Sequence, residues 1–241
     1  MHGLRAHVQR LTLTLRWRPE WRVAAAAAAA WLALLTGLGM HRAHVGPDHS
    51  PLGVLAGLPG WSVMVVAMMV PATLPAVRHV GLNSMRRRRE RAMAIYTMVY
   101  VGAWALFGVT ALGTHHLLTF HLGLGDTGAL ALALVVAAGW QLTRAKRRAL
   151  YACGRTVPLP PIGHRADAAC ARYALLHARR CMQSCWAIML VMVALGHSSL
   201  AWMVALTALV VAEELTVRGR WVTRPAAATL AVAAGAVTLG A

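Results

Sequence analysis

Apolar segments alternate with polar ones along the chain. Seven apolar segments occur, at about residues 23–40, 54–77, 93–118, 129–142, 183–195, 200–215 and 226–241. A bilayer core about 30 Å thick takes roughly 20 helical residues, so the segment at 129–142 is expected to borrow residues from its loops. The pattern predicts an all-α fold, a polytopic transmembrane helix bundle of about seven helices.

The polar segments define the domain organisation. Residues 1–22 form a basic N-terminal segment, which is expected to lead into an uncleaved anchor helix. Residues 23–241 form a single membrane domain, in which the polar stretch 143–182 is expected to be a basic cytoplasmic loop. Composition agrees, because 59% of the 241 residues are hydrophobic and only 13% are charged, against about a quarter in soluble domains.

Positive charge is distributed asymmetrically about the predicted bundle. The chain has 24 Lys and Arg and 7 Asp and Glu, and when alternate loops share a side, only Arg42 of these basic residues lies opposite the others. Because basic loops remain in the cytoplasm, we expect a multi-pass protein of the cytoplasmic membrane with its N-terminus inside and its C-terminus outside. These loops are expected to contact anionic lipid headgroups. No motif for nucleic-acid recognition accompanies them.

A row of metal-binding side chains begins where the basic stretch meets the fifth apolar segment. His177, Cys181, Cys185 and Met189 recur every fourth residue, and Met192 follows on the same side. At about 100° per residue, this spacing places them on one helix face. Imidazole, thiol and thioether together suit Cu(I) and other soft metals. The alternative is ordinary packing, since Met and Cys are common in cores.

Two methionines of the second apolar segment extend this set. Met64 and Met68 are four residues apart, and Met68 comes at a similar depth to Met189 when the antiparallel segments are counted from their ends. They are expected to line a passage with Met189 and Met192, between histidines at the outer face and thiols at the inner face. Packing alone would give the same spacing.

Glu213 is the acidic candidate ligand. It lies at the inner end of segment 200–215, where a tight helical hairpin is expected to bring it beside Cys185. An acidic residue at the edge of a span is by default a functional-site hypothesis, because burying its charge is costly. The alternative is an ion pair with Arg218 or Arg220.

The sequence carries no sign of hydrolytic or group-transfer chemistry. It has no Gly-x-Ser-x-Gly, no His-Glu-x-x-His and no phosphate-binding glycine loop, so we expect a protein that is not an enzyme. All four cysteines, including Cys153 and Cys170, lie at the predicted cytoplasmic side. They are expected to be free, because thiols stay reduced there.

Several of these residues belong to an ordered set of motifs. The set is Trp61-x-x-Met64-x-x-x-Met68-Met69-x-Pro71, Trp104-Ala-x-Phe107-Gly108, Gln141-Leu-Thr-x-x-Lys146-Arg, His177-x-x-x-Cys181-x-x-x-Cys185-Trp186-Ala, Trp202-Met203 and Ala212-Glu213. Over residues 54–225 the chain thereby resembles the predicted metal-binding integral membrane proteins, domain of unknown function 2182. The resemblance implies a helical membrane protein with a metal role. Ser184 and Ala149 stand where that family typically has cysteines.

Three functions remain open from the sequence. The first is a membrane protein that binds or helps move a soft transition metal, with copper the best match. It would hold the metal at His177 and the two cysteines of the row, with Glu213 in support, and a membrane or metal-carrier protein as partner. The second is an assembly or scaffold subunit that binds a protein partner and no metal. The third is a haem or quinone protein that uses His115, His116 and His197.

Overall fold

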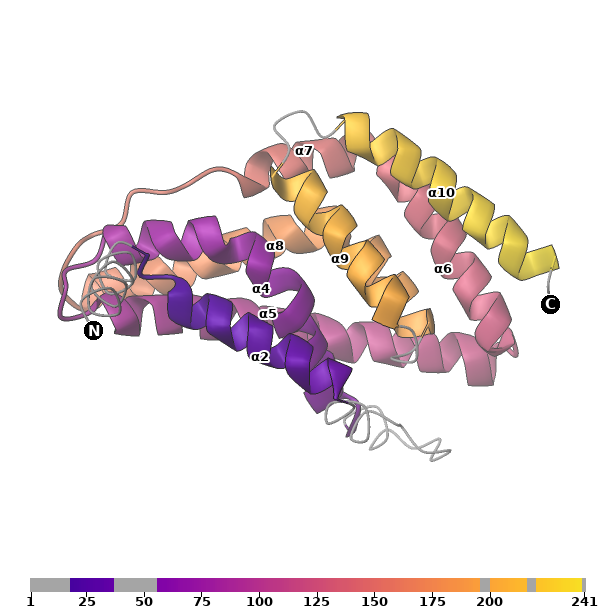
Figure 1. The fold of residues 1–241 in the computed structure, drawn as a ribbon, viewed down its shortest axis with the longest axis horizontal. Coiled ribbons are helices and arrows are strands. Elements are labelled where there is room, and N and C mark those ends of the chain that lie inside the picture. Colours follow the sequence, from indigo (N-terminus) through magenta and orange to yellow (C-terminus); the bar gives the residue numbers. More distant parts are fainter. Residues whose placement is uncertain (1–17, 37–55, 196–199, 216–219, 240–241) are drawn as a thin grey trace, which may run out of the picture.

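The computed structural model describes residues 18–36, 56–195, 200–215 and 220–239 (Figure 1). All regular structure within these ranges is helical, which confirms the all-α prediction. The α-helices are α2 (Trp21–Leu35), α4 (Leu58–Leu82), α5 (Arg89–His116), α6 (Gly125–Leu142), α7 (Arg144–Cys153), α8 (His164–Leu195), α9 (Leu200–Leu215) and α10 (Arg220–Leu239), and α5 continues into a π-helix, η1 (Leu117–His121).

Five of the helices are long and apolar enough to cross a membrane. They are Leu58–Leu82, Arg89–His121, Gly125–Leu142, Arg165–Leu195 and Trp221–Leu239. The helices at the expected first and sixth spans, α2 and α9, have 15 and 16 residues and fall short of the usual crossing length of about 20. Five of the seven expected spans therefore have crossing length in the described residues. As expected, α6 borrows residues from its loop and starts at Gly125.

The polar stretch 143–182, which was expected to be a basic cytoplasmic loop, is mostly helical. α7 occupies Arg144–Cys153, and α8 begins at His164, well before the expected start of the fifth span. Alanine, leucine and arginine are strong helix formers, so a polar composition did not preclude helix. Thr143 begins α7 by accepting a hydrogen bond from the backbone N–H of Lys146.

The helices pack around three central ones, α4, α5 and α8. α5 contacts both α4 and α8, and α2 lies along α4 (Figure 1). On the other side, α6 packs between α8 and α10, while α9 contacts α4, α8 and α10, and α7 bridges α8 and α9. The larger hydrophobic core includes side chains from α4, α5, α6, α8 and α9. The metal-binding residues predicted on α8 and α4 lie within this core.

α4 continues through two prolines, although proline inside a helix usually bends or stops it. The helix runs to Leu82 with Pro71 and Pro75 inside it. A proline has no N–H, so Pro71 leaves the carbonyl of Ala67, four residues earlier, without its usual partner. Trp31 of α2 donates its indole N–H to this carbonyl at 2.8 Å. A neighbouring helix thus satisfies the freed carbonyl, as a span in lipid requires.

Close contact between α4 and α5 depends on a glycine. The indole N–H of Trp61 donates to the carbonyl of Trp104 at 2.8 Å. A Cβ atom at Gly108 would lie 2.4 Å from the Trp61 ring, so only glycine fits there. Since Trp61 and Gly108 both occur in the motifs above, the motifs reflect helix packing as well as metal chemistry.

Some predictions concern residues outside the described part of the chain. His41, His44 and His49 of the first loop, His197 of the helical hairpin, and Arg218 all fall there.

Candidate metal centre

The row predicted on α8 faces the interior of the bundle. His177, Cys181, Cys185, Met189 and Met192 are all buried, with at most 5% of each side chain exposed. Their common burial follows from the four-residue spacing on a helix that packs against α5, α6 and α7. The row therefore does not face lipid.

Two of these thiols meet a carboxylate from α9. The Sγ atoms of Cys181 and Cys185 and a carboxylate oxygen of Glu214 all lie within 4.8 Å of one another. The Cys181 thiol donates to Glu214 Oε1 at 3.2 Å, and Cys185 Sγ lies 4.0 Å from the same oxygen. These two soft sulfur atoms and one oxygen are close enough together to bind one metal ion.

The carboxylate in this group belongs to Glu214, whereas the sequence suggested Glu213. Glu213 accepts a hydrogen bond from Lys146 Nζ at 2.7 Å, and both side chains are fully buried. Successive residues of a helix point about 100° apart, so only one of the two glutamates can face α8. The alternative partner expected for Glu213 was also different, because the cation is Lys146 of α7.

Two tyrosines of α5 contact the same face of α8. The Tyr100 hydroxyl donates to Cys181 Sγ at 3.1 Å, and the Tyr96 hydroxyl lies 2.9 Å from His177 Nδ1. Both pairs span four residues on each helix, so they form two successive rungs between α5 and α8. His177 Nε2 is buried and has no hydrogen-bond partner among the described residues. His177 therefore lies one turn from the thiols and outside the three-residue group.

Ser184 and Cys153 complete the surroundings of the thiols. Ser184, at a position where a cysteine was expected, donates its hydroxyl to the carbonyl of Cys181 at 2.8 Å and lies 3.2 Å from Cys185 Sγ. Cys153, at the end of α7, belongs to the same hydrophobic cluster as Cys181 and Cys185. Burial, and then the charge of Glu214, raise the pKa of the Cys153 thiol, which therefore stays protonated.

The predicted methionines belong to the same cluster. Met64 and Met68 of α4 and Met189 and Met192 of α8 are buried together with the two cysteines in one hydrophobic core. The structure thus brings the thioethers and thiols into one connected interior. Packing accounts for this arrangement as well as a metal passage does.

Comparison with protein families gives this arrangement a context. The family model PpoB2, described as a copper chaperone, matches residues 58–237. The chain belongs to the PpoB2 copper chaperone family. Comparisons with curated proteins and with solved structures gave no match. The PpoB2 match covers nearly the same stretch as the motifs, and its description agrees with the metal role that they implied.

The three-residue group fits the cargo of a PpoB2 protein. Thiolates are soft ligands that select Cu(I) over harder ions, and a hydrophobic shell around a site limits the access of water. Both sulfur atoms are fully buried, and the four cysteines described are free thiols. All three members of the group lie inside the PpoB2 match.

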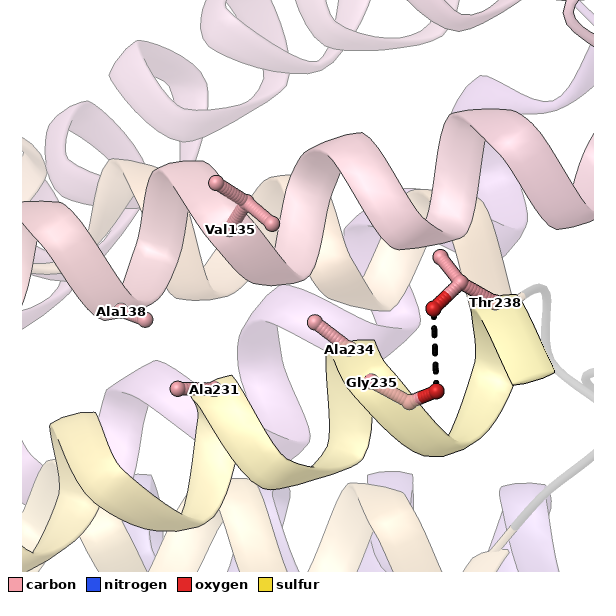
Figure 2. Close-up of a pocket in the computed structure, with 6 residues that line it drawn as sticks. All are labelled: Val135, Ala138, Ala231, Ala234, Gly235 and Thr238. Atoms are coloured by element: carbon pink, nitrogen blue, oxygen red, sulfur yellow. Dashed lines mark hydrogen bonds between the residues drawn. The ribbon is translucent and has the colours of Figure 1, made fainter.

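A cavity elsewhere in the PpoB2 protein has different chemistry. It has a volume of about 300 Å³ and lies between α6 and α10, as Figure 2 shows. Its lining is apolar except for Thr238, whose hydroxyl donates to the carbonyl of Gly235 at 2.9 Å. The lining offers no thiol, imidazole or carboxylate and does not suit a metal. Its residues are Val135, Ala138, Ala231, Ala234, Gly235 and Thr238.

Sequence reasoning missed several residues of this PpoB2 centre. Tyr96 and Tyr100 carry the same four-residue spacing as the row on α8, and that signal pointed to a shared face. Lys146 and Glu213 occurred in two separate motifs, and nothing in the sequence paired them. Glu214 was adjacent to the predicted residue, and choosing between them required the rotation of α9.

Proposed function

We propose that this PpoB2-family protein resides in the cytoplasmic membrane, binds Cu(I) at Cys181 and Cys185, and passes it to a protein partner without catalysing a reaction. The observation that carries this proposal is the convergence of two buried thiols and one carboxylate oxygen within 4.8 Å. The proposal also assumes that the family of domain of unknown function 2182 and the PpoB2 family are the same family.

The chemistry of the ligands supports copper as the cargo. Cu(I) prefers thiolate and thioether ligands, and it binds few of them at a time. Cys181 and Cys185 would supply the two thiolates, and Glu214 Oε1 lies where it can bind the ion or the Cys181 thiol. Met189 and Met192, one and two turns further along α8, would offer weaker sulfur ligands along the bundle. His177 would be a neighbouring ligand on the other side.

The orientation and lipid contacts form part of the same proposal. The asymmetry of basic residues favours a cytoplasmic N-terminus, which would place Cys181 and Cys185 near the cytoplasmic side. The basic start of α5 is anchored to α8, because Arg88, just before α5, and Arg91, in its first turn, both pair with Asp167. Exposed arginines of this turn would contact anionic headgroups.

The test is copper content of the full chain, purified in mild detergent under reducing conditions and loaded with Cu(I). We expect near-stoichiometric copper with sulfur ligands in its X-ray absorption spectrum. The Cys181→Ser, Cys185→Ser double variant should lose this sulfur-bound copper. Cys170→Ser is the matched control, because Cys170 is a buried thiol on the same helix that lies in a different cluster.

The same experiment distinguishes this proposal from the rival function. Protein that carries no sulfur-bound copper, while a stoichiometric protein partner co-purifies with it, would replace this proposal with the metal-free assembly subunit. Equal loss of copper in Cys170→Ser would show that folding, and not the two ligands, was disturbed.

A further inference from the structure

Two histidine side chains meet at the far end of α5. The ring centroids of His116 and His121 are 5.7 Å apart. His116 is the last residue of α5, and His121 is the last residue of η1. Sixteen residues separate His116 from Tyr100, which is about 24 Å at 1.5 Å per residue. The pair is therefore well separated from the thiols.

The π-helix is what brings the two rings together. In a regular α-helix, residues five apart are rotated by about 140° from each other and face different directions. η1 instead has hydrogen bonds between residues five apart, such as Leu122 N–H to the Leu117 carbonyl at 3.1 Å. Thr119 supports this widened turn, because its hydroxyl lies 2.9 Å from the His115 carbonyl and 3.3 Å from that of His116.

Imidazole nitrogens at this turn lack partners. The Nε2 atoms of His115 and His116 are buried, and no described residue hydrogen-bonds to them. A buried polar atom without a partner costs about 1–3 kcal/mol, so such atoms usually indicate a bound water or ion. Asp126, in the first turn of α6, carries a negative charge that acts on His115.

We propose that His116 and His121 form a second copper site, a two-imidazole docking site for Cu(I) at the C-terminal end of α5, away from the thiols. Imidazole is a good copper ligand, and metal–nitrogen bonds of about 2 Å on either side of an ion fit two rings at this separation. The choice of copper rests on the proposed function, whereas the residues are entirely different from those of the thiol centre. An ion held here would lie well away from Cys181 and Cys185 along the bundle.

The test uses the full chain in the Cys181→Ser, Cys185→Ser background, so that thiol-bound copper does not contribute. Cu(I) is titrated anaerobically against a chromophoric chelator, and X-ray absorption identifies the ligands. We expect nitrogen-bound Cu(I), and at least a tenfold loss of its affinity in His121→Gln. His121 is exposed, so this substitution leaves the packing intact. His116→Gln should have the same effect.

His115→Gln is the matched control, because His115 also has a buried Nε2 atom without a partner but its ring is not paired with another imidazole among the described residues. Its affinity should be unchanged. The site is overturned if the double-serine background binds no Cu(I), if His121→Gln binds as tightly as that background, or if His115→Gln loses affinity equally. The sulfur signal of the wild-type protein is measured separately, so failure of the imidazole site and failure of the thiol centre give different results.

Discussion

Cys181, Cys185 and Glu214 come from two helices and are held in place by a third, whereas His116 and His121 are close together because of the backbone of a single turn. The thiol centre therefore depends on how α7, α8 and α9 pack. The imidazole pair depends on five residues of η1. Tertiary packing between helices positions the thiol centre, whereas local backbone conformation positions the imidazole pair.

The two sites should therefore be sensitive to different substitutions. A substitution distant in sequence can disturb the thiol centre through the contacts of α9 and leave the imidazole pair unchanged. A change within η1 should do the reverse. This difference can be tested by substitutions that touch neither set of ligands.

The largest effect is expected from Lys146→Met. This substitution leaves Glu213 buried without its cation, which should lower the free energy of unfolding by about 3–5 kcal/mol. α9 should lose its position beside α8, and sulfur-bound copper should fall while nitrogen-bound copper remains. Unfolding in a denaturing detergent and X-ray absorption measure the two effects. A Lys146→Met, Glu213→Leu double variant should recover most of the stability; if it does not, the ion pair is not the cause.

Tyr100→Phe should have the next largest effect. It removes a hydrogen bond to Cys181 Sγ that favours the thiolate form, so Cu(I) affinity at the thiols should fall about fivefold, or about 1 kcal/mol. Competition with a chromophoric chelator measures this change. Tyr96→Phe is the control, because its hydroxyl contacts His177 and not a thiol. An equal loss in Tyr96→Phe would make His177 part of the site.

Thr119→Val should affect the imidazole end alone. The loss of its hydroxyl contacts to the carbonyls of His115 and His116 should destabilise η1 by about 0.5–1.5 kcal/mol. Hydrogen exchange of the η1 amides should become faster, and nitrogen-bound copper should weaken. Thr110→Val, which removes a similar contact to the Phe107 carbonyl within α5, serves as the control. Weaker sulfur-bound copper in Thr119→Val would contradict the independence of the two ends.

The smallest effect concerns Cys153. Its pKa is raised in the folded protein, so the unfolded thiol loses its proton at lower pH and stability should fall as pH rises above the ordinary thiol pKa of about 8.5. By pH 9 this thiol alone should cost less than about 1 kcal/mol. Unfolding measured between pH 7 and 9 in metal-free protein should show a smaller decline in Cys153→Ser. An unchanged decline would assign it to other groups.

The helical class and the row on α8 could be predicted because they follow from periodicity. Apolar length predicts spans, and a four-residue spacing places Cys181 and Cys185 on one face whatever surrounds them. The helices within 143–182 were missed because their polar composition was taken as evidence for a loop. Hydropathy measures the affinity of a segment for lipid, and this differs from its tendency to form a helix.

What could not be predicted depends on contacts between distant residues or on backbone irregularity. Choosing Glu214 over Glu213 required the rotation of α9, which the Lys146 ion pair helps to fix. Predicting the hydrogen-bond partner of the Ala67 carbonyl required the position of α2. η1 has no sequence period that distinguishes it from the helix before it, so His116 could be recognised as a candidate ligand but its pairing with His121 could not.

The indole of Trp31 has a consequence for modularity. The family match starts at residue 58, yet α4 inside it has a backbone gap at Pro71 that is closed from α2, outside the match. Transplanting residues 58–237 into another protein would leave the Ala67 carbonyl without a hydrogen-bond donor unless the new host offered one at the same position. The unit that folds as a whole is thus longer than the stretch that matches the copper-chaperone family, because α2 supplies the hydrogen bond that Pro71 cannot make.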